Sequence, residues 1–243
     1  MRYSHKVYIY RRRFQLLLTI LFSIVAFGTL LVFIQFVNIS TTVLILDLLA
    51  SMYRVISAYL ISLVLAVIVG ILVTRNNYVE DILLPILDVL QSFPSFAILP
   101  IAILWFGASN ITAIFFLVIT ILWPVLFSVV GGIKAVRGDI SEAAEVFGAR
   151  GWKKIRYFLL PAIFPSIVTG SIIGWGEGWE AIVGAEIIGI STGVGAFLNE
   201  ASKAGETKVL IAGILFLLFF IFFLNKLIWL PLLKKSTQFS SEE

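Results

Sequence analysis

Cysteine is absent from this chain of 243 residues, and histidine occurs once. The lack of cysteine excludes disulfides, iron–sulfur clusters and thiol catalysis. The single histidine, His5, lies in a basic N-terminal tail, which argues against a histidine-based metal site or catalytic triad. Charge is also scarce: 13% of residues are charged, about half the share of a soluble domain. With 60% hydrophobic residues and a mean hydropathy of +1.06, the composition predicts a membrane protein.

Uninterrupted apolar runs predict six transmembrane helices, since one crossing needs about 20 apolar residues. The 45 residues from Val89 to Ile133 carry no charge, and the turn signal "FGASN" at 106–110 divides them into two crossings. Prolines 85, 94, 100 and 124 predict kinks within these two. The expected spans are 16–36, 55–74, 84–106, 111–133, a fifth from Pro161 through "GSIIGWGEGW" at 170–179, and 209–230.

The basic residues predict the orientation of these spans. Fifteen of the 18 Lys and Arg residues fall in the two termini and the 75–81 and 134–160 loops, and three fall on the opposite side. By the positive-inside rule both termini are cytoplasmic, including a basic tail at 1–13 and a C-terminal tail at 232–243. The basic pI of about 9.4 is therefore a topology signal, and no nucleic-acid partner is expected.

The predicted cytoplasmic loop 134–160 contains a polar insert with the signals of a short helix. Asp139 is placed to cap its N-terminus, and Glu142, three residues later, can complete a capping box. Gly148 follows the last apolar residue, where a left-handed C-terminal cap favours glycine. An apolar stripe between the caps must be buried in lipid or in a protein groove, and the spacing alone leaves both open. The stripe consists of Ile140, Ala143, Ala144 and Phe147.

This insert resembles the EAA motif of ABC importer permeases, E-A-A-x3-G-x9-I-x-L-P. The match runs from Glu142 to Pro161, with Phe158 in place of the isoleucine. The segments "QSFPSFAILPIAILWFG" at 91–107, "GAEIIG" at 184–189 and "GVGAFLNEA" at 193–201 are similar to the nitrate/sulfonate/taurine branch. The likeness covers about residues 50–230, so a permease domain is expected at 14–231.

The resemblance implies an all-α, MetI-like type I importer permease fold in a multi-pass protein of the plasma or inner membrane. The implied partners are ATP-binding-cassette ATPase subunits, an extracellular or periplasmic solute-binding protein, a second permease copy and membrane lipid. No Gly-Lys pair of a Walker A loop occurs here, so this chain is expected to be no enzyme and to bind no cofactor of its own. ATP and Mg²⁺ would be bound by the ATPase. In such permeases the EAA helix docks on the ATPase; here the coupling residues would be Asp139, Glu142, Ala143, Ala144, Phe147, Gly148, Leu160 and Pro161.

The fifth span carries the candidate solute path. Gly170, Gly174 and Gly178 recur every four residues, which predicts close helix packing either within the subunit or at the central pathway of a dimer. Trp175 and Trp179 could line a path, although an interfacial belt is the preferred interpretation. Carboxylates inside a membrane should face a cavity, a partner or the outer surface. Those of this region are Glu177, Glu180 and Glu186.

Three functions from different classes remain open. The preferred one is the permease subunit of an ABC importer for a small anion or sulfonate-like solute, although three glutamates also suit a neutral or cationic solute. The alternative is a secondary transporter driven by an ion gradient, with Glu177 and Glu180 as proton or sodium sites. It predicts inverted repeats, which are not evident between 14–133 and 134–231. A membrane scaffold without transport activity is the third, and the EAA spacing argues against both alternatives.

Overall fold

The computed structural model describes Gly28 and residues 40–240, and every regular element in this part is helical. The all-α prediction is therefore confirmed, whereas the predicted span 16–36 and the tail 1–13 lie outside the described residues. The elements, with η marking 3₁₀- or π-helical turns, are α2 (Thr41–Val73), α3 (Asn77–Gln91), η1 (Ser95–Ala97), α4 (Leu99–Phe106), α5 (Asn110–Val146), α6 (Trp152–Lys154), η2 (Ile155–Leu159), α7 (Leu160–Ala162), α8 (Phe164–Gly189), α9 (Val194–Lys203), α10 (Thr207–Leu224), η3 (Asn225–Trp229) and α11 (Leu230–Ser240).

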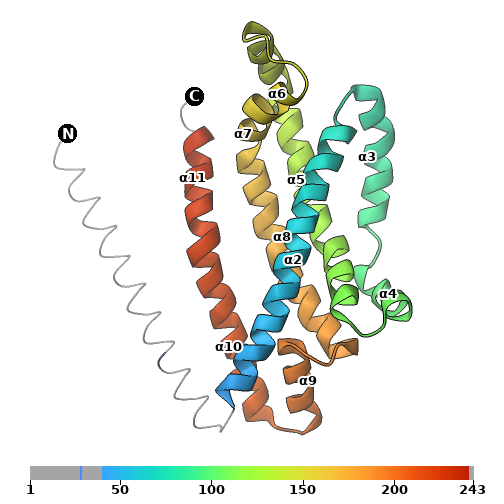
Figure 1. Ribbon diagram of the computed structural model, residues 1–243, viewed down its shortest axis with the longest axis vertical. Helices are drawn as coiled ribbons and strands as arrows, with labels where there is room; N and C mark the ends of the chain where they lie inside the picture. Colours follow the sequence, from blue (N-terminus) through green and yellow to red (C-terminus); the bar gives the residue numbers. More distant parts are fainter. Residues whose placement is uncertain (1–27, 29–39, 241–243) are drawn as a thin grey trace, which may run out of the picture.

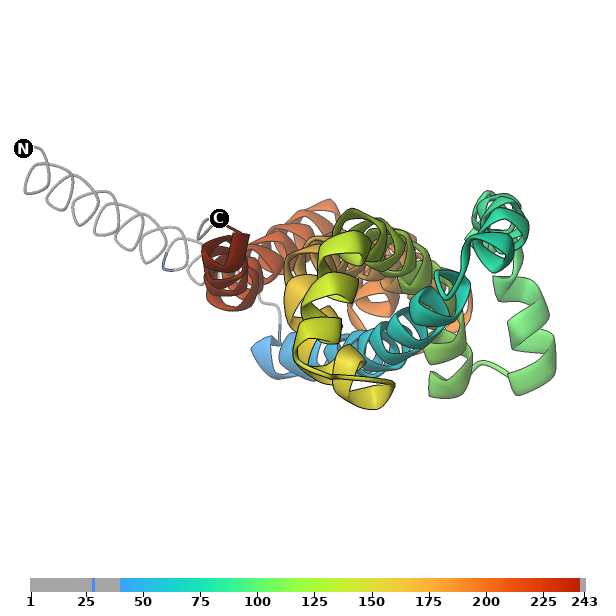
Figure 2. The same cartoon turned by 90° about the horizontal axis from the view of Figure 1, so that it is seen from above.

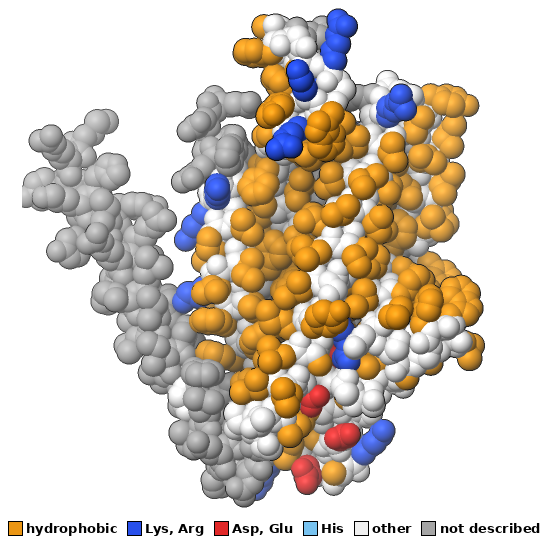
Figure 3. All heavy atoms as spheres, in the orientation of Figure 1, with side chains coloured by type: hydrophobic (Ala, Val, Ile, Leu, Met, Phe, Trp, Pro, Cys, Tyr) orange, Lys and Arg blue, Asp and Glu red, His pale blue; other side chains and the backbone are white. Residues whose placement is uncertain are grey.

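The long helices α2, α5, α8 and α10–α11 extend along the long axis of the molecule (Figure 1). The turn containing α6 lies at one end together with the end of α11, and α4 and α9 lie at the other. Seen along the long axis, α3 and α4 lie on one side of the bundle and α11 on the opposite side (Figure 2). A broad apolar surface covers the middle of the face in Figure 3, with Lys and Arg grouped toward the α6 end and acidic side chains toward the α9 end.

Four helices of the described part are long and apolar enough to cross a membrane, and a fifth crossing is formed if the bent pair α3 and η1–α4 counts as one. They correspond to the five predicted spans that fall within the described residues. The total of six stays a prediction, because the first span lies outside them.

The second and third spans differ from their predicted form. α2 begins at Thr41, so Arg54, predicted to lie just before the span, lies inside the helix. The third span is broken: Asn77–Gln91 and Ser95–Phe106 meet at 71°. Pro94 stands between the two parts and Pro100 in the first turn of α4, and proline removes a backbone donor and restricts the residue before it.

Helix α5 corrects the prediction of a separate coupling helix capped by Asp139. It continues without interruption from Asn110 to Val146, so Asp139 lies inside a helix and does not cap one. A glycine inside a helix costs only about 0.5–1 kcal/mol relative to alanine. Ending the helix before Gly138 and nucleating a new one costs more, because nucleation fixes several residues for one hydrogen bond. The backbone hydrogen bonds of α5 therefore continue through Gly138.

The approach to the fifth span also differs from the prediction that Pro161 begins it. The helical path starts at Trp152 and passes through the π-helical turn η2 before α7 and α8. Pro161 lies in the first turn of α7, directly after the π-helical turn η2. The predicted sixth span 209–230 lies within the continuous path from α10 to α11.

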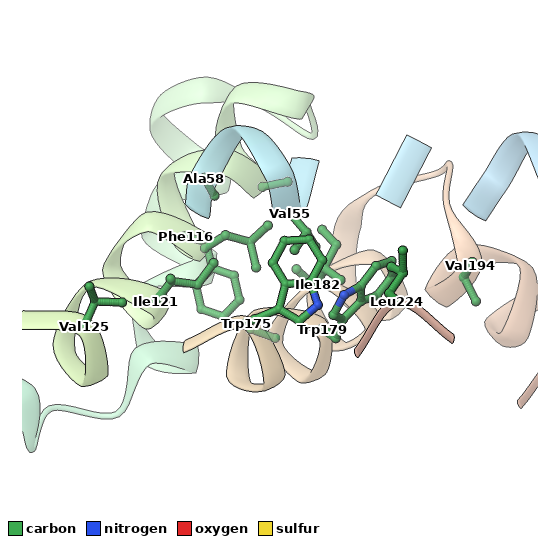
Figure 4. Packing of buried hydrophobic residues seen from close by; sticks show 14 of the residues in the cluster. Val55, Ala58, Phe116, Ile121, Val125, Trp175, Trp179, Ile182, Val194 and Leu224 are labelled. Carbon is green, nitrogen blue, oxygen red and sulfur yellow. The ribbon is translucent and has the colours of Figure 1, made fainter. Parts of the chain in front are cut away.

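The core is formed where α2, α5 and α8 pack together, with α9 and α10 closing one end (Figure 4). Val55 from α2, Phe116 and Ile121 from α5, and Ile182 from α8 are fully buried. In a bilayer, lipid solvates apolar side chains well, so close van der Waals packing must hold the helices together. The core therefore depends on how closely the helix backbones can approach.

We predict that Asn76→Ala destabilises the N-terminal end of α3. The side-chain oxygen of Asn76 accepts a hydrogen bond of 2.8 Å from the backbone N–H of Val79, which satisfies one unpaired donor of the first turn. Loss of such a cap costs about 1 kcal/mol. Thermal unfolding in detergent should show a lower midpoint for Asn76→Ala. Asn76→Asp, which keeps the acceptor, should resemble wild type, and equal midpoints for all three proteins would contradict the prediction.

Candidate functional site

The EAA residues lie at the free end of α5, in a turn that ends the helix sharply. Gly148 has φ of +64°, in the left-handed region where only glycine is unstrained. The N–H of Ala149 donates a 2.8 Å hydrogen bond to the carbonyl oxygen of Ala144, which is the long-range bond of a Schellman motif. The predicted glycine C-cap is confirmed.

The apolar stripe near this turn is divided between burial and exposure. Ala144 is buried and Ala143 is half-buried, whereas Phe147 is 76% exposed. The ring of Phe147 stands 5.9 Å from that of Phe158, centre to centre, so the two arms of the turn touch at this point. Glu142 is exposed as well. The turn thus presents exposed apolar rings and a carboxylate at one end of the molecule.

The glycine seam of α8 packs against α5 of the same chain. A Cβ on Gly170 would lie 2.6 Å from Cβ of Ser128 and 2.8 Å from the carbonyl oxygen of Pro124. Cβ atoms on Gly174 and Gly178 would lie 3.1 Å and 2.8 Å from Ile121. The seam therefore serves packing within the subunit, the simpler of its two predicted roles.

Trp175 and Trp179 do not form the predicted interfacial belt. They are 4% and 2% exposed and lie side by side in the core, with ring centres 6.2 Å apart (Figure 4). Trp175 also makes edge contacts with Tyr59 and Trp229 at 5.7 and 5.9 Å. Aromatic rings packed edge to face stabilise one another beyond the area they bury. The sequence could not distinguish this cluster from a belt, because both need tryptophan in an apolar helix.

Glu186 is buried in an ion pair with Arg54 of α2. The Nη1 of Arg54 lies 2.6 Å from Oε1 of Glu186, and both side chains are shielded from solvent. Ser51 donates to the same carboxylate at 2.8 Å, and so does the backbone N–H of Gly195 at the start of α9. Of the predicted surroundings of a carboxylate inside the membrane, a cavity, a partner or the outer surface, Glu186 has a partner, and this partner is basic.

The remaining N–H donors of Arg54 form hydrogen bonds with two more segments. Its Nε donates to the side-chain oxygen of Asn110 at 2.7 Å, and its Nη1 and Nη2 donate to the backbone and side-chain oxygens of Thr192 at 2.7 and 2.6 Å. One guanidinium therefore joins α2, the first residue of α5, the end of α8 and the loop before α9. The sequence reasoning missed this role. A single arginine between two apolar runs was the available signal.

Glu177 and Glu180 share an exposed face of α8, as their spacing predicts. Glu177, but not Glu180, lines a pocket of about 250 Å³ where the broken third span meets α5 and α8. The structure thus separates the three predicted glutamates: one in a buried ion pair, one in a pocket and one on the exposed helix surface. The pocket lining consists of Gln91, Phe93, Ser95, Thr120, Trp123, Pro124 and Glu177.

Comparison with known families matches residues 62–228 to the binding-protein-dependent transport system inner membrane component family. The chain belongs to that family. Together with its apolar helices, this membership makes the chain a multi-pass membrane protein. The matched region contains α5 with the EAA turn, the whole of α8, α9 and the pocket. The resemblance drawn from the EAA spacing is confirmed.

Individual members of the family are similar over much of the chain. It is 33% identical over 165 residues to the taurine transport system permease protein TauC of Escherichia coli (strain K12) and 32% identical over 165 residues to the putative aliphatic sulfonates transport permease protein SsuC of Bacillus subtilis (strain 168). It is 34% identical over 170 residues to the nitrate import permease protein NrtB of Leptolyngbya laminosa. These matches cover 68–69% of this chain and 60% of each relative's length.

Proposed function

We propose that this chain is the transmembrane permease subunit of an ATP-binding-cassette importer. Two permease copies would enclose the solute path, and separate ATPase subunits would bind ATP and Mg²⁺ and supply the energy. Its relatives are permeases for taurine, aliphatic sulfonates and nitrate, which supports a small anionic or sulfonate-like solute. A binding protein outside the membrane would deliver the solute at the end that carries α4 and α9.

The observation that carries this proposal is the EAA turn at the tip of a continuous helix. α5 carries Glu142 near one end, with Phe147 directly after that end, and Asn110, the partner of Arg54, at the other end. Thr120 and Trp123 of the pocket lie between them. At 1.5 Å per residue this helix is roughly 55 Å long. A displacement of the tip by an ATPase would therefore reach both the pocket and the contacts of Arg54 through one continuous helix.

The orientation proposed is that the α6 end faces the cytoplasm. Lys and Arg gather toward this end on the face in Figure 3, as the positive-inside rule requires of a cytoplasmic surface. The end of α11 lies at the same end, which agrees with a cytoplasmic C-terminus (Figure 1). The exposed Phe147 and Trp152 of the turn then face the compartment that holds the ATPase.

Capture of the ATPase subunit tests the proposal. We expect the wild-type chain, purified in detergent, to retain its cognate ATPase, and Glu142→Lys to lose most of it because the charge at the docking surface is reversed. Gly148→Val should also lose it, since a β-branched residue is strained at positive φ. The matched control is Gly131→Val in α5, where an added Cβ would meet nothing within 4 Å and φ is not in the left-handed region. It should retain the ATPase.

Two results would overturn the proposal. Equal retention in all four proteins would show that the turn is no docking element. Absence of the ATPase from wild type, together with solute uptake that collapses when a protonophore removes the proton gradient, would favour the ion-driven alternative. In that case Glu177 would be the first residue to study.

A further inference from the structure

The pocket beside Glu177 lies along the fifth span, near the middle of α8. Glu177 stands close to the midpoint of α8, which extends from Phe164 to Gly189. At 1.5 Å per residue, either end of the helix is roughly 20 Å away. A carboxylate at this depth costs several kcal/mol unless it faces water or a partner. Among the described residues no Lys or Arg forms an ion pair with it, and its side chain borders the pocket and has the carboxylate of Glu180 nearby.

The polar atoms of the lining include several acceptors. The hydroxyl of Thr120 donates its hydrogen to the carbonyl oxygen of Phe116 at 3.1 Å, which leaves its lone pairs available. The amide nitrogen of Gln91 donates to Asp88 at 2.6 Å, and its carbonyl oxygen remains an acceptor. With the two oxygens of Glu177, the lining offers several acceptors beside the hydroxyl of Ser95 and the indole N–H of Trp123, which can donate.

The net charge and the aromatic rings of the pocket lining also favour a cation. The seven lining residues include no Lys, Arg or His, so the described part of the pocket has a net negative charge. The rings of Phe93 and Trp123 also line it, and aromatic faces attract cations. An oxyanion in this place would meet a carboxylate and acceptor oxygens. A group with a positive charge and several N–H donors would satisfy them.

We propose that this pocket binds an ammonium group of the transported solute, with Glu177 as its counter-ion. The inference rests on the proposed importer function and narrows it: a sulfonate-like solute carrying this group crosses as a small zwitterion. The pocket volume of about 250 Å³ suits such a solute, since sites for drug-sized ligands begin near 300 Å³. Gln91 and Thr120 complete the coordination of the N–H donors.

The break in the third span creates the space for this site. η1 and the residues around Pro94 bring Phe93 and Ser95 to the pocket, opposite Trp123 and Pro124 of α5. A straight helix from 84 to 106 would continue in the direction of α3 and would lack the bend that brings these residues to the pocket. Because α5 also carries the EAA turn, movement of α5 would change the pocket while the solute is bound.

The test compares two probes that differ by one ammonium group, taurine and ethanesulfonate. Equilibrium binding of each is measured by ligand-observed NMR on the full-length chain in lipid nanodiscs, with wild type, Glu177→Gln and Glu200→Gln. We expect wild type to bind taurine at least tenfold more tightly than ethanesulfonate, about 1.4 kcal/mol. Glu177→Gln should lose this preference. Glu200→Gln, which removes an exposed carboxylate on α9, should keep it.

Three outcomes would overturn the inference: equal binding of both probes, binding of neither, or a preference for taurine that Glu177→Gln retains. Displacement of taurine by sodium chloride, but not by choline chloride at equal ionic strength, would instead assign the carboxylate to a metal cation and also overturn it. ATPase capture by Glu177→Gln, measured in parallel, should equal that of wild type. If taurine binding gives one of these outcomes while the ATPase is still retained, this inference alone is rejected. If the ATPase is not retained, the importer proposal is rejected.

Discussion

Arg54→Met is expected to destabilise the protein by about 3–5 kcal/mol, the usual cost of removing one partner of a buried ion pair. The substitution leaves the carboxylate of Glu186 buried without its counter-ion, although Ser51 and Gly195 still donate to it. It also removes three hydrogen bonds, to Asn110 and to both oxygens of Thr192. Thermal unfolding in detergent should show the lowest midpoint of any single substitution considered for this protein.

A double-mutant cycle separates the ion pair from the loss of packing. Arg54→Met combined with Glu186→Met replaces both charges by apolar chains of similar length, and we expect it to be more stable than Arg54→Met alone. Coupling between residues in direct contact is typically 0.5–3 kcal/mol. Lys203→Met, an exposed cation of α9, is the matched control and should unfold at the wild-type midpoint. Additive effects of the two substitutions would contradict the pairing.

The consequence of Arg54→Met for transport follows from the segments that Arg54 joins. Two hydrogen bonds hold the start of α9. The N–H of Gly195 donates to the carboxylate of Glu186, and the N–H of Val194 donates to the hydroxyl oxygen of Ser51 at 3.0 Å. When the ion pair is lost, these contacts weaken together, and α9 and the loop before it lose their fixed position. Limited proteolysis should then cut near residues 191–206 in the variant before it cuts the wild type.

Gly170→Ala and Gly176→Ala are expected to change stability in opposite directions. A Cβ on Gly170 would overlap Ser128 and the backbone oxygen of Pro124, and the backbone cannot rotate away. Overpacking of this kind costs about 1–3 kcal/mol. A Cβ on Gly176 meets nothing within 4 Å, so alanine there should stabilise the helix by about 0.5–1 kcal/mol.

Both variants change one hydrogen to one methyl group in the same helix, so composition and helix propensity cancel between them. Unfolding by SDS titration in mixed micelles measures the difference. A lower midpoint for Gly170→Ala with an unchanged or higher one for Gly176→Ala supports packing of the seam on α5. Equal midpoints would show that the seam is not in contact with α5, and the dimer-interface interpretation would then regain support.

The sequence predicted well those features that depend on local composition. Long uncharged runs placed five spans within the described residues, because a bilayer demands about 20 apolar residues per crossing. Gly148 was identified as a C-cap because positive φ strongly favours glycine. The EAA spacing identified the family, since a capped turn needs its residues in a fixed order along the chain.

Predictions failed where the sequence offered two local solutions of similar energy. Asp139 can cap a helix or lie within one, and the continuity of α5 decided for the second. Trp175 and Trp179 suit a membrane interface or a core, and the rings of Tyr59 and Trp229, from distant helices, decided for the core. The third span could kink gently or break, and it breaks beside Pro94 at 71°.

The sequence by itself determined the helices, the charge-rich cytoplasmic turn of the proposed topology and the family, because each depends on neighbours along the chain. Tertiary structure alone decided which glutamate is neutralised and which lines a pocket. Glu186 and Arg54 are 132 positions apart and meet at 2.6 Å, whereas Glu177, nine positions earlier on the same helix, faces the pocket. In a medium that hydrates no charge, the role of a carboxylate follows from what the fold places opposite it.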